Sequence, residues 1–250
     1  MCQKNRIDKI LFERGLAPSR ERAQAYIMSG NVLVNEVPVT KSGSKIDINA
    51  NIRIKGMDQP FVGRGGLKLE KAIEQFSLSI KHKIAMDVGA STGGFTDCLL
   101  QHGAVYVFAV DVGHNQLAWD IRQHPKVKDL EKTNFRNMPF SIIGTFVDII
   151  VIDVSFISLT KILNNCLNFL TQKGDLIALI KPQFEAGKEN INKGGIVSKE
   201  NIKADVIASI TKYAESVGFF CRNSVISSPI QGKKSGNQEF LIHLGKQDNS

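Results

Sequence analysis

Residues 84–95, Ile-Ala-Met-Asp-Val-Gly-Ala-Ser-Thr-Gly-Gly-Phe, decide the fold of this chain. A short apolar run leads directly into a turn with three glycines, and a helical pattern follows at residues 95–103. Glycines at such a turn let the backbone bend tightly and approach a ligand closely. The stretch therefore predicts a strand, a ligand-binding turn and a helix of an α/β domain.

Strand and helix patterns alternate from this stretch to the end of the chain. Further strands are expected at residues 105–113, 127–132, 147–156, 175–182, 219–228 and 239–245, with helices at residues 116–124, 159–170 and 202–218. Such alternation predicts a Rossmann-like α/β fold, with a mostly parallel seven-stranded sheet and helices on both faces. We place this domain at residues 67–246, beginning with a helix at residues 67–76.

Residues 1–58 predict a separate, small α+β domain. Helices are expected at residues 6–15 and 20–29, each ending at a glycine, and Ser19 is suited to cap the second helix. Short alternating runs at residues 32–35, 37–40, 45–48 and 52–54 predict strands. Residues 59–66 are rich in glycine, proline and polar side chains, so we expect a linker there.

The composition argues against a membrane protein, a secreted protein and a metal-binding protein. No apolar run approaches the ~20 residues that a membrane helix needs, and the chain does not start with a signal peptide. The four cysteines are scattered without a Cys-x-x-Cys pair, so we expect neither a metal site nor a disulfide framework. These features predict a cytoplasmic protein that has no membrane partner.

Positive charge is concentrated at the start of the chain. The net charge is +8; residues 1–60 contain 10 Lys and Arg against 6 Asp and Glu, whereas the rest contain 22 against 18. A basic module on a larger domain favours a polyanion as partner, although basic helical faces are also common for solubility alone. The candidate RNA-binding residues are Arg6, Lys9, Arg14, Arg20, Arg22, Lys188, Lys193, Lys233 and Lys234.

Three charged residues border apolar strands, where a buried charge is costly unless it is paired. Asp153 ends the run Ile-Ile-Val-Ile-Asp, Lys181 ends Leu-Ile-Ala-Leu-Ile-Lys, and Glu239 opens the last strand. Charges at the carboxyl ends of parallel strands point into the crevice where such sheets bind ligands. Together with Lys68 they are the candidate catalytic residues. Any one of them could be an ordinary solvent-exposed charge at the end of a strand, but this is a poor explanation for the whole set.

The glycine-rich turn indicates which cofactor binds. Its pattern is Asp-x-Gly-x-x-x-Gly-Gly, which differs from the dinucleotide pattern Gly-x-Gly-x-x-Gly and lacks the lysine of a phosphate loop. Asp111 ends the next strand, where an acid can accept hydrogen bonds from ribose, and Asn134 follows the third strand. S-adenosylmethionine therefore fits better than NAD. The candidate cofactor-binding residues are Asp87, Gly89, Ser91, Gly93, Gly94, Phe95, Asp111, Asn134 and Asp153.

Three resemblances add to these inferences. Arg6-Ile-Asp8, Ser19-Arg20 with Ala23, and Gly30-x-Val32-x-Val34-Asn35 resemble the S4-like RNA-binding fold. The set Lys68, Asp153, Lys181 and Glu239 resembles the K-D-K-E tetrad of FtsJ-type ribose 2′-O-methyltransferases. Nearly the whole chain is similar to the TlyA (haemolysin A) family. The matching stretches are Arg64-Gly-Gly-Leu-Lys68-Leu, residues 87–95, Asp111-Val-Gly-x-x-Gln-Leu, Asp153-Val-Ser-Phe-Ile-Ser158, Lys181-Pro-Gln-Phe-Glu185 and Asn237-x-Glu239-Phe-Leu. Gly63 departs from the expected serine.

The resemblance implies S-adenosylmethionine-dependent 2′-O-methylation of cytidine in ribosomal RNA. It points to 23S rRNA, with 16S rRNA as a second target in longer members, and the short ends of this chain favour 23S alone. Lys181 is the candidate base for the ribose hydroxyl, because burial beside a second cation, Lys68, favours a neutral amine. Asp153 and Glu239 would then neutralise and orient the lysines.

Three alternatives remain open from the sequence. The chain could be an RNA-binding protein with an inactive methyltransferase fold, although an inactive domain has no need for four charges beside a cleft. A membrane-lytic role would match the haemolysin name, but no strongly amphipathic apolar segment supports it. An NAD-linked dehydrogenase is disfavoured by the glycine spacing. The oligomeric state and the target nucleotide are not predicted.

Overall fold

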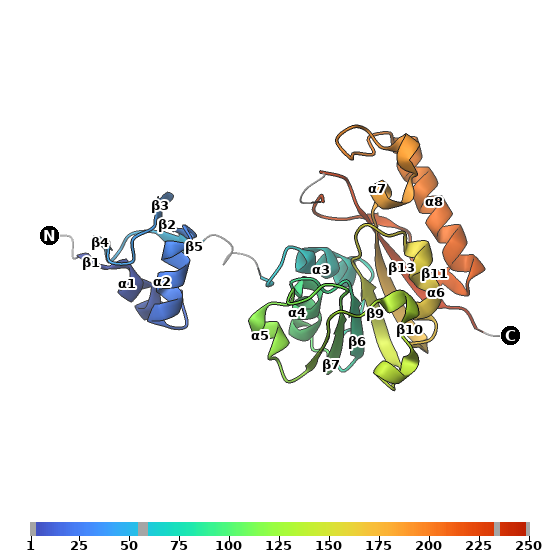
Figure 1. The fold of residues 1–250 in the computed structure, drawn as a ribbon, viewed down its shortest axis with the longest axis horizontal. Coiled ribbons are helices and arrows are strands. Elements are labelled where there is room, and N and C mark those ends of the chain that lie inside the picture. The colour runs from blue at the N-terminus through green and yellow to red at the C-terminus, as the bar shows by residue number, and fades with distance from the viewer. Residues whose placement is uncertain (1–3, 55–59, 233–235, 249–250) are drawn as a thin grey trace. The chain divides into compact units, whose positions relative to one another are not determined.

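The computed structural model describes residues 4–54, 60–232 and 236–248, and it divides the chain into two compact units (Figure 1). The first is Met1–Pro60 and the second is Phe61–Ser250. The domain boundary expected at residue 58 lies among residues 55–59, outside the described part of the chain. Each unit has its own apolar core, so each is described by itself.

The described part of the N-terminal unit contains two helices and five short strands. Its elements are β1 (Lys4–Arg6), α1 (Ile7–Glu13), α2 (Arg20–Met28), β2 (Val32–Val34), β3 (Val37–Val39), β4 (Lys45–Asp47) and β5 (Ile52–Ile54). Strand β2 pairs with β3 and β5, and β1 pairs with β4. Ile7, Leu11 and Ile27 of the helices pack with Val32 of the sheet. The Ser19 hydroxyl accepts a hydrogen bond from the Arg22 backbone N–H, which confirms the expected cap.

The large unit carries the remaining elements. Its helices are α3 (Gly65–Gln75), α4 (Gly94–Gln101), α5 (Trp119–Arg122), α6 (Leu163–Cys166), α7 (Pro182–Glu185) and α8 (Glu200–Ser216), with short 3₁₀ turns at Phe135–Asn137, Phe140–Ile142, Leu159–Lys161 and Lys188–Asn190. Its strands are β6 (Ile84–Val88), β7 (Tyr106–Val110), β8 (Val127–Leu130), β9 (Val147–Ile152), β10 (Leu170–Ile180), β11 (Phe219–Cys221), β12 (Ile226–Ser227) and β13 (Phe240–Lys246).

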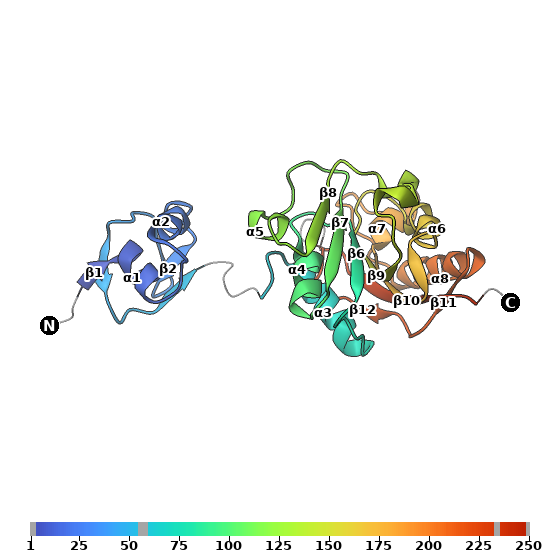
Figure 2. The same cartoon turned by 90° about the horizontal axis from the view of Figure 1, so that it is seen from below.

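The strands form one mixed sheet in the order β11-β13-β10-β9-β6-β7-β8. Figure 2 shows β8, β7, β6, β9 and β10 side by side in this order. Strand β13 is antiparallel to β10 and β11, and the pairs from β10 to β8 are parallel. The expected seven-stranded, mostly parallel sheet is confirmed, and the short β12 joins it by pairing with β13.

Helices cover both faces of this sheet, in two apolar layers (Figure 1). On one face Leu69 of α3 and Leu99 of α4 pack on Val151 of β9. On the other face α6 and α8 pack on side chains such as Ile150, which alternate with the first set along the same strands. The sheet is therefore buried on both sides, which explains why its strands are near-continuous apolar runs.

Some expected element boundaries were wrong. The expected helix at residues 159–170 is a 3₁₀ turn followed by the short α6, and residue 170 already belongs to β10. The Asn165 side chain donates hydrogen bonds to the carbonyls of Phe135 and Met138, and asparagine competes with helical backbone bonds in this way. The helix expected at residues 116–124 is only α5, and α3 begins at Gly65, earlier than residue 67.

The strand order brings the candidate site residues to one edge. Strands β6, β7, β9 and β10 are parallel, so Gly89, Asp111, Asp153 and Lys181, which follow them, lie at the same edge of the sheet. The antiparallel β13 starts at this edge, because Phe240 is the partner of Ile180. Ligands of open α/β sheets bind at this edge, where the strand order reverses. No helix of the described residues is long and apolar enough to cross a membrane.

Candidate functional site

Four charged side chains from separate parts of the chain meet at this edge of the sheet. Lys68 is the fourth residue of α3, Asp153 follows β9, and Lys181 follows β10. Glu239 directly precedes β13. The structure therefore brings together all four of the candidate catalytic residues.

The four side chains form one chain of ion pairs. Lys68 Nζ lies 2.6 Å from Glu239 Oε2 and 3.5 Å from Asp153 Oδ2. Lys181 Nζ lies 2.5 Å from the other oxygen of the same carboxylate, Asp153 Oδ1. Lys68, Lys181 and Glu239 are buried, with exposed fractions of 8%, 7% and 3%. Burial of so many charges is costly unless they pair in this way.

The pairing is unequal between the two lysines. Lys68 has two carboxylate partners, whereas Lys181 shares Asp153 with Lys68 and donates a further hydrogen bond to the neutral Ser155 hydroxyl at 2.9 Å. Ser155 was not among the candidate residues, although it lies two positions after Asp153 in a quoted motif. Lys181 is thus the lysine that is held by less negative charge.

A cavity of about 370 Å³ lies beside Asp153 and extends over the ends of β6, β7 and β8. Of the candidate cofactor-binding residues, Gly89, Ser91, Asp111, Asn134 and Asp153 line this cavity. Gly89 has a φ of +86°, and a side-chain carbon there would lie 2.6 Å from the Asp153 carbonyl oxygen. Because the turn passes so close to the end of β9 and has a positive φ here, only glycine fits this position without strain.

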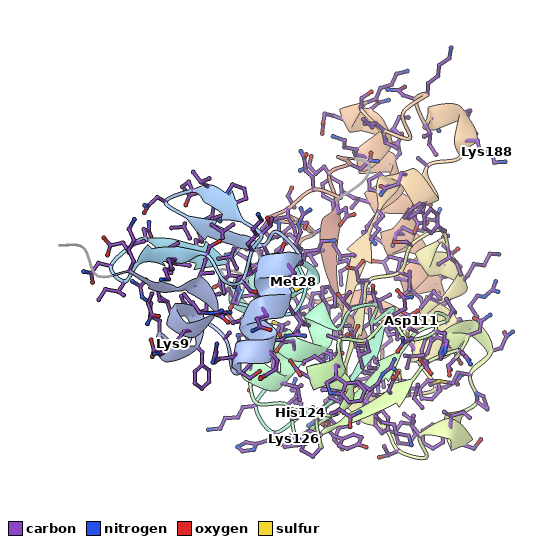
Figure 3. The ribbon with its side chains drawn as sticks, turned by 60° about the vertical axis from the view of Figure 1, so that its left-hand side comes forward. Lys9, Met28, Asp111, His124, Lys126 and Lys188 are labelled. Atoms are coloured by element: carbon purple, nitrogen blue, oxygen red, sulfur yellow. The ribbon has the colours of Figure 1, made fainter. Side chains whose placement is uncertain are left out.

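Asp111 organises the turns around the cavity. Its Oδ2 accepts a hydrogen bond from the Ser91 backbone N–H, and its Oδ1 accepts one from the Gly113 N–H, both at 2.7 Å. The carboxylate thereby joins the turn after β6 to the turn after β7, and it lies at the end of the sheet in Figure 3. Each carboxylate oxygen keeps a further lone pair for a ligand hydroxyl.

Asn134 lines the third side of the cavity. Its side-chain oxygen accepts hydrogen bonds from the backbone N–H and the Nε of Arg136, so the amide group is fixed at the start of the following 3₁₀ turn. Apolar walls lie next to it, formed by residues such as Val110, Val112 and Ile157. Flat apolar walls with a few fixed polar groups are typical of small-molecule sites.

Asp87, Gly93, Gly94 and Phe95 do not line this cavity. A side-chain carbon at Gly94 would lie 3.0 Å from the Gly63 carbonyl oxygen, so this glycine permits close packing of the segment before α3. Phe95 is buried in the core between α3 and the sheet. These residues support the turn through packing and do not line the cavity. A sequence pattern cannot distinguish a glycine that permits packing from one that borders the ligand.

Asp87 is fully buried beneath the glycine-rich turn. Thr96 donates a hydroxyl hydrogen bond to its Oδ2 at 2.7 Å, and its Oδ1 has no hydrogen-bond partner among the described residues. Burial raises the pKa of Asp87 to about 7, and the nearby negative charges of Asp153 and Asp111 act in the same direction. Asp87 is therefore a structural carboxyl group that titrates near neutral pH.

An exposed aromatic side chain lines the same cavity as Asp153. Phe156 lines the cavity, yet its side chain is 89% exposed, and its backbone has a φ of +64°. Its ring lies 5.1 Å from the ring of Phe184 in α7. A large apolar residue in this backbone region is uncommon, and such strain is often found at functional sites. Phe156 lies within the stretch Asp153–Ser158 but was not among the expected site residues.

The candidate RNA-binding residues differ in how firmly they are held. Arg6 and Arg20 bind the buried Asp8, Lys9 pairs with Glu13, Arg14 donates hydrogen bonds to the carbonyls of Ile48 and Ala50, and Arg22 lies over the Tyr26 ring. Lys9 and Lys188 project outward from α1 and from the turn after α7 (Figure 3). Lys193 is exposed, whereas Lys233 and Lys234 lie outside the described residues.

Asn237 is a buried polar residue that was not among the expected site residues. Its side chain accepts a hydrogen bond from the Val197 N–H at 2.9 Å and donates one to the Gly195 carbonyl at 2.8 Å. It thereby ties the segment before α8 to the residues just before Glu239. Its only sequence signal was its place in the motif that contains Glu239.

Comparison with known proteins agrees with this geometry. The FtsJ-like methyltransferase profile matches residues 61–246, and the S4 domain profile matches residues 5–52. YqxC of Bacillus subtilis, provisionally named an rRNA methyltransferase, is 47% identical over 97% of this chain and 86% of its own length. The 16S/23S rRNA (cytidine-2′-O)-methyltransferase TlyA of Mycobacterium tuberculosis is 38% identical over 99% of this chain and 92% of its own.

The solved structures agree as well. A protein from Streptococcus thermophilus, provisionally named a hemolysin, superposes with a TM-score of 0.75 and 44% identity, over 99% of this chain and 90% of that chain. The match to the methyltransferase profile covers the whole edge where the four charged side chains meet, and the full-length relatives include the basic N-terminal unit. This chain therefore belongs to the FtsJ-like methyltransferase family and carries an S4 domain in front of the methyltransferase domain.

Proposed function

We propose that the protein transfers a methyl group from S-adenosylmethionine to the ribose 2′-hydroxyl of a cytidine in ribosomal RNA, with 23S rRNA as the first target and 16S rRNA as the second. The observation that carries the proposal is the chain of ion pairs among Lys68, Glu239, Asp153 and Lys181, in which Asp153 also lines the cavity. The name of the M. tuberculosis relative supports the substrate class.

The residues around the cavity fit this cofactor. Asp111 has carboxylate lone pairs available for the two ribose hydroxyls, and the apolar residues near Asn134 suit the faces of an adenine ring. The turn at Gly89 carries no lysine and needs none, because the cofactor contains no phosphate. When bound, S-adenosylmethionine supplies a methyl group activated by its positive sulfur. Asp153 lines the same cavity and would favour that positive charge.

Lys181 is the base in this proposal. A ribose hydroxyl is a weak nucleophile, so its proton must be taken as it reacts, and a positioned side chain contributes typically ~10²–10⁴-fold. Among the described residues Lys181 pairs with one carboxylate, which it shares with Lys68, so we assign the role of base to Lys181 rather than to Lys68. Glu239 holds Lys68, which holds Asp153 in turn, so these residues orient the Lys181 amine.

Phe156 gives the target nucleotide a place to stack. A 2′-hydroxyl can reach a buried amine only if its nucleotide leaves the RNA stack, and proteins hold such bases against aromatic rings. Phe156 is exposed, lies at the rim of the cavity and contacts Phe184, which limits its motion. The rings therefore form a platform for the extruded cytidine.

The basic N-terminal unit supplies RNA affinity in this proposal. Its arginines are held in fixed positions rather than projecting freely, as expected for binding to a structured RNA by its shape and backbone. Lys188 and Lys193 are exposed on the large unit and can add phosphate contacts. The substrate is ribosomal RNA or a ribosomal subunit, and the protein works in the cytoplasm.

The test is methyl transfer from labelled S-adenosylmethionine to 23S and 16S rRNA and to ribosomal subunits, followed by mapping of 2′-O-methylcytidine. Lys181→Ala should lower the rate at least a hundredfold and leave cofactor affinity within a few-fold. Lys212→Ala, on the exposed side of α8, is the matched control. Transfer by Lys181→Ala above a tenth of wild type would exclude the assigned role, and leakage of liposomes without any RNA methylation would favour the membrane-lytic alternative.

A further inference from the structure

Asp8 of α1 is a fully buried carboxylate in a small, basic domain. Such a group is costly to bury unless every lone pair is matched by a donor. Helical packing does not require an acid there, because the neighbours Ile7 and Leu11 form an ordinary apolar core. The structural environment of Asp8 therefore points to a role beyond packing.

The donors around Asp8 come mainly from two arginines. Its Oδ1 accepts from Arg6 Nε at 3.0 Å and from the Lys9 backbone N–H at 2.9 Å. Its Oδ2 accepts from Arg6 Nη2 at 3.0 Å, from Arg20 Nη2 at 3.1 Å and from Gln24 Nε2 at 3.1 Å. The two-pronged bond from Arg6 holds the pKa of Asp8 well below its usual range, so the carboxylate stays charged.

The two guanidinium groups meet at one oxygen atom. Both Nη2 atoms contact Asp8 Oδ2, so two like charges lie side by side, and the buried anion between them offsets their repulsion. The side chains of Arg6 and Arg20 are about half exposed, at 47% and 48%. Their outer edges therefore face solvent, with two positive charges against one negative charge.

A turn that contains a glycine borders this pair. The turn at residues 41–44 is fixed to the start of α1, since the Ile7 N–H donates to the Ser44 carbonyl at 2.9 Å. Gly43 in this turn borders Arg6, and a side-chain carbon there would lie 3.7 Å from Arg6 Nη1. Because residue 43 is a glycine, it places no side chain against the Arg6 guanidinium.

We propose that Asp8 is a positioning residue that holds Arg6 and Arg20 as a single two-guanidinium site for one phosphate of an RNA backbone. Guanidinium groups bind phosphate in two-pronged geometry, and fixing them in advance lowers the ordering cost of binding. The RNA part of this inference rests on the proposed function above. The geometric part of the inference, a joint anion site held by Asp8, is independent of the proposed function.

The first test measures binding of the full chain to a 23S rRNA transcript over a range of salt concentrations. Asp8→Asn keeps the shape of the side chain but removes its charge, and it should weaken binding roughly tenfold. The loss of one phosphate contact should lower the slope of log K against log salt by roughly 0.7–0.9. In an Arg6→Ala, Arg20→Ala background, Asp8→Asn should add no further loss, because the residues act as one site.

The matched control is Glu36→Gln in the same unit. Glu36 also forms a two-pronged pair with an arginine, Arg53, but this pair is exposed, and among the described residues no second guanidinium contacts Glu36. Glu36→Gln should leave affinity within twofold and the salt slope unchanged. Affinity of Asp8→Asn within twofold of wild type, or a further tenfold loss in the double-arginine background, would overturn the inference.

The second test needs no RNA and also covers a failure of Asp8→Asn to fold. Inorganic phosphate is titrated into the wild-type chain while the arginine Nε–H signals are followed by NMR. The Arg6 and Arg20 signals should shift together with one dissociation constant, and folded Asp8→Asn should lose this joint response. Independent shifts, or none, would contradict the joint site. A joint response without RNA affinity would leave the Asp8 site standing and reject the RNA-binding part of the proposed function.

Discussion

The carboxylate of Asp111 allows the proposed cofactor site to be tested on its own. In Asp111→Asn the amide nitrogen cannot accept a hydrogen bond, so one of the two backbone N–H groups, Ser91 or Gly113, loses its acceptor at 2.7 Å. The bond to a ribose hydroxyl changes from charged to neutral at the same time. A hydrogen bond to a charged group contributes about 1.5–3 kcal/mol, so we expect the dissociation constant for S-adenosylmethionine to rise roughly 10- to 150-fold.

Isothermal titration calorimetry measures this constant directly. The fluorescence of Trp119, the single tryptophan of the chain, gives a second signal from α5, close in sequence to the cavity-lining Gln116. Asp120→Asn, an exposed acid on the same helix, is the matched control and should leave the constant unchanged. RNA affinity of Asp111→Asn should also stay the same. Cofactor affinity of this variant within twofold of wild type would refute the reasoning.

Three further predictions follow from the structure. The pKa of Asp87 is about 7 in the fold and near 3.8 in the unfolded chain, so between these pH values the folded state binds more protons than the unfolded state. The free energy of unfolding should therefore fall as pH rises from about 4 to 7 because of this group. In urea titrations Asp87→Asn should reduce that fall, and an unchanged pH profile would contradict a protonated Asp87. Phe156→Ala should raise KM for rRNA several-fold to about a hundredfold, since stacking of a base contributes roughly 1–3 kcal/mol. Cofactor affinity, measured by calorimetry, should stay unchanged. An unchanged KM would contradict the proposed stacking of the target base on Phe156. Removal of residues 1–60 should leave a folded domain that binds the cofactor but binds rRNA weakly and with a shallower salt slope, and equal slopes for the two chains would show that the N-terminal unit is not the RNA anchor.

Much of the fold follows from local patterns in the sequence. The strand at residues 84–88 and the turn at Gly89 were predictable, because an apolar run followed by glycines has few other stable forms. The ends of β9 and β10 were predictable too, since Asp153 and Lys181 interrupt apolar runs. Parallel strands expose their carboxyl ends at one edge, so the meeting of these residues followed from the fold class.

Only the tertiary structure decided which polar groups pair and which face the cavity. Glu239 reaches Lys68 because the antiparallel β13 lies beside β10, and no local pattern encodes that neighbour. Asp87 lies in β6, two residues before Gly89, and is fully buried, whereas Ser91 in the following turn lines the cavity. Asp8 could be recognised as the anchor of two arginines only once α1 and α2 were packed together. Periodicity is a property of neighbouring residues, whereas the partner of a buried charge depends on register and side-chain direction across elements distant in sequence.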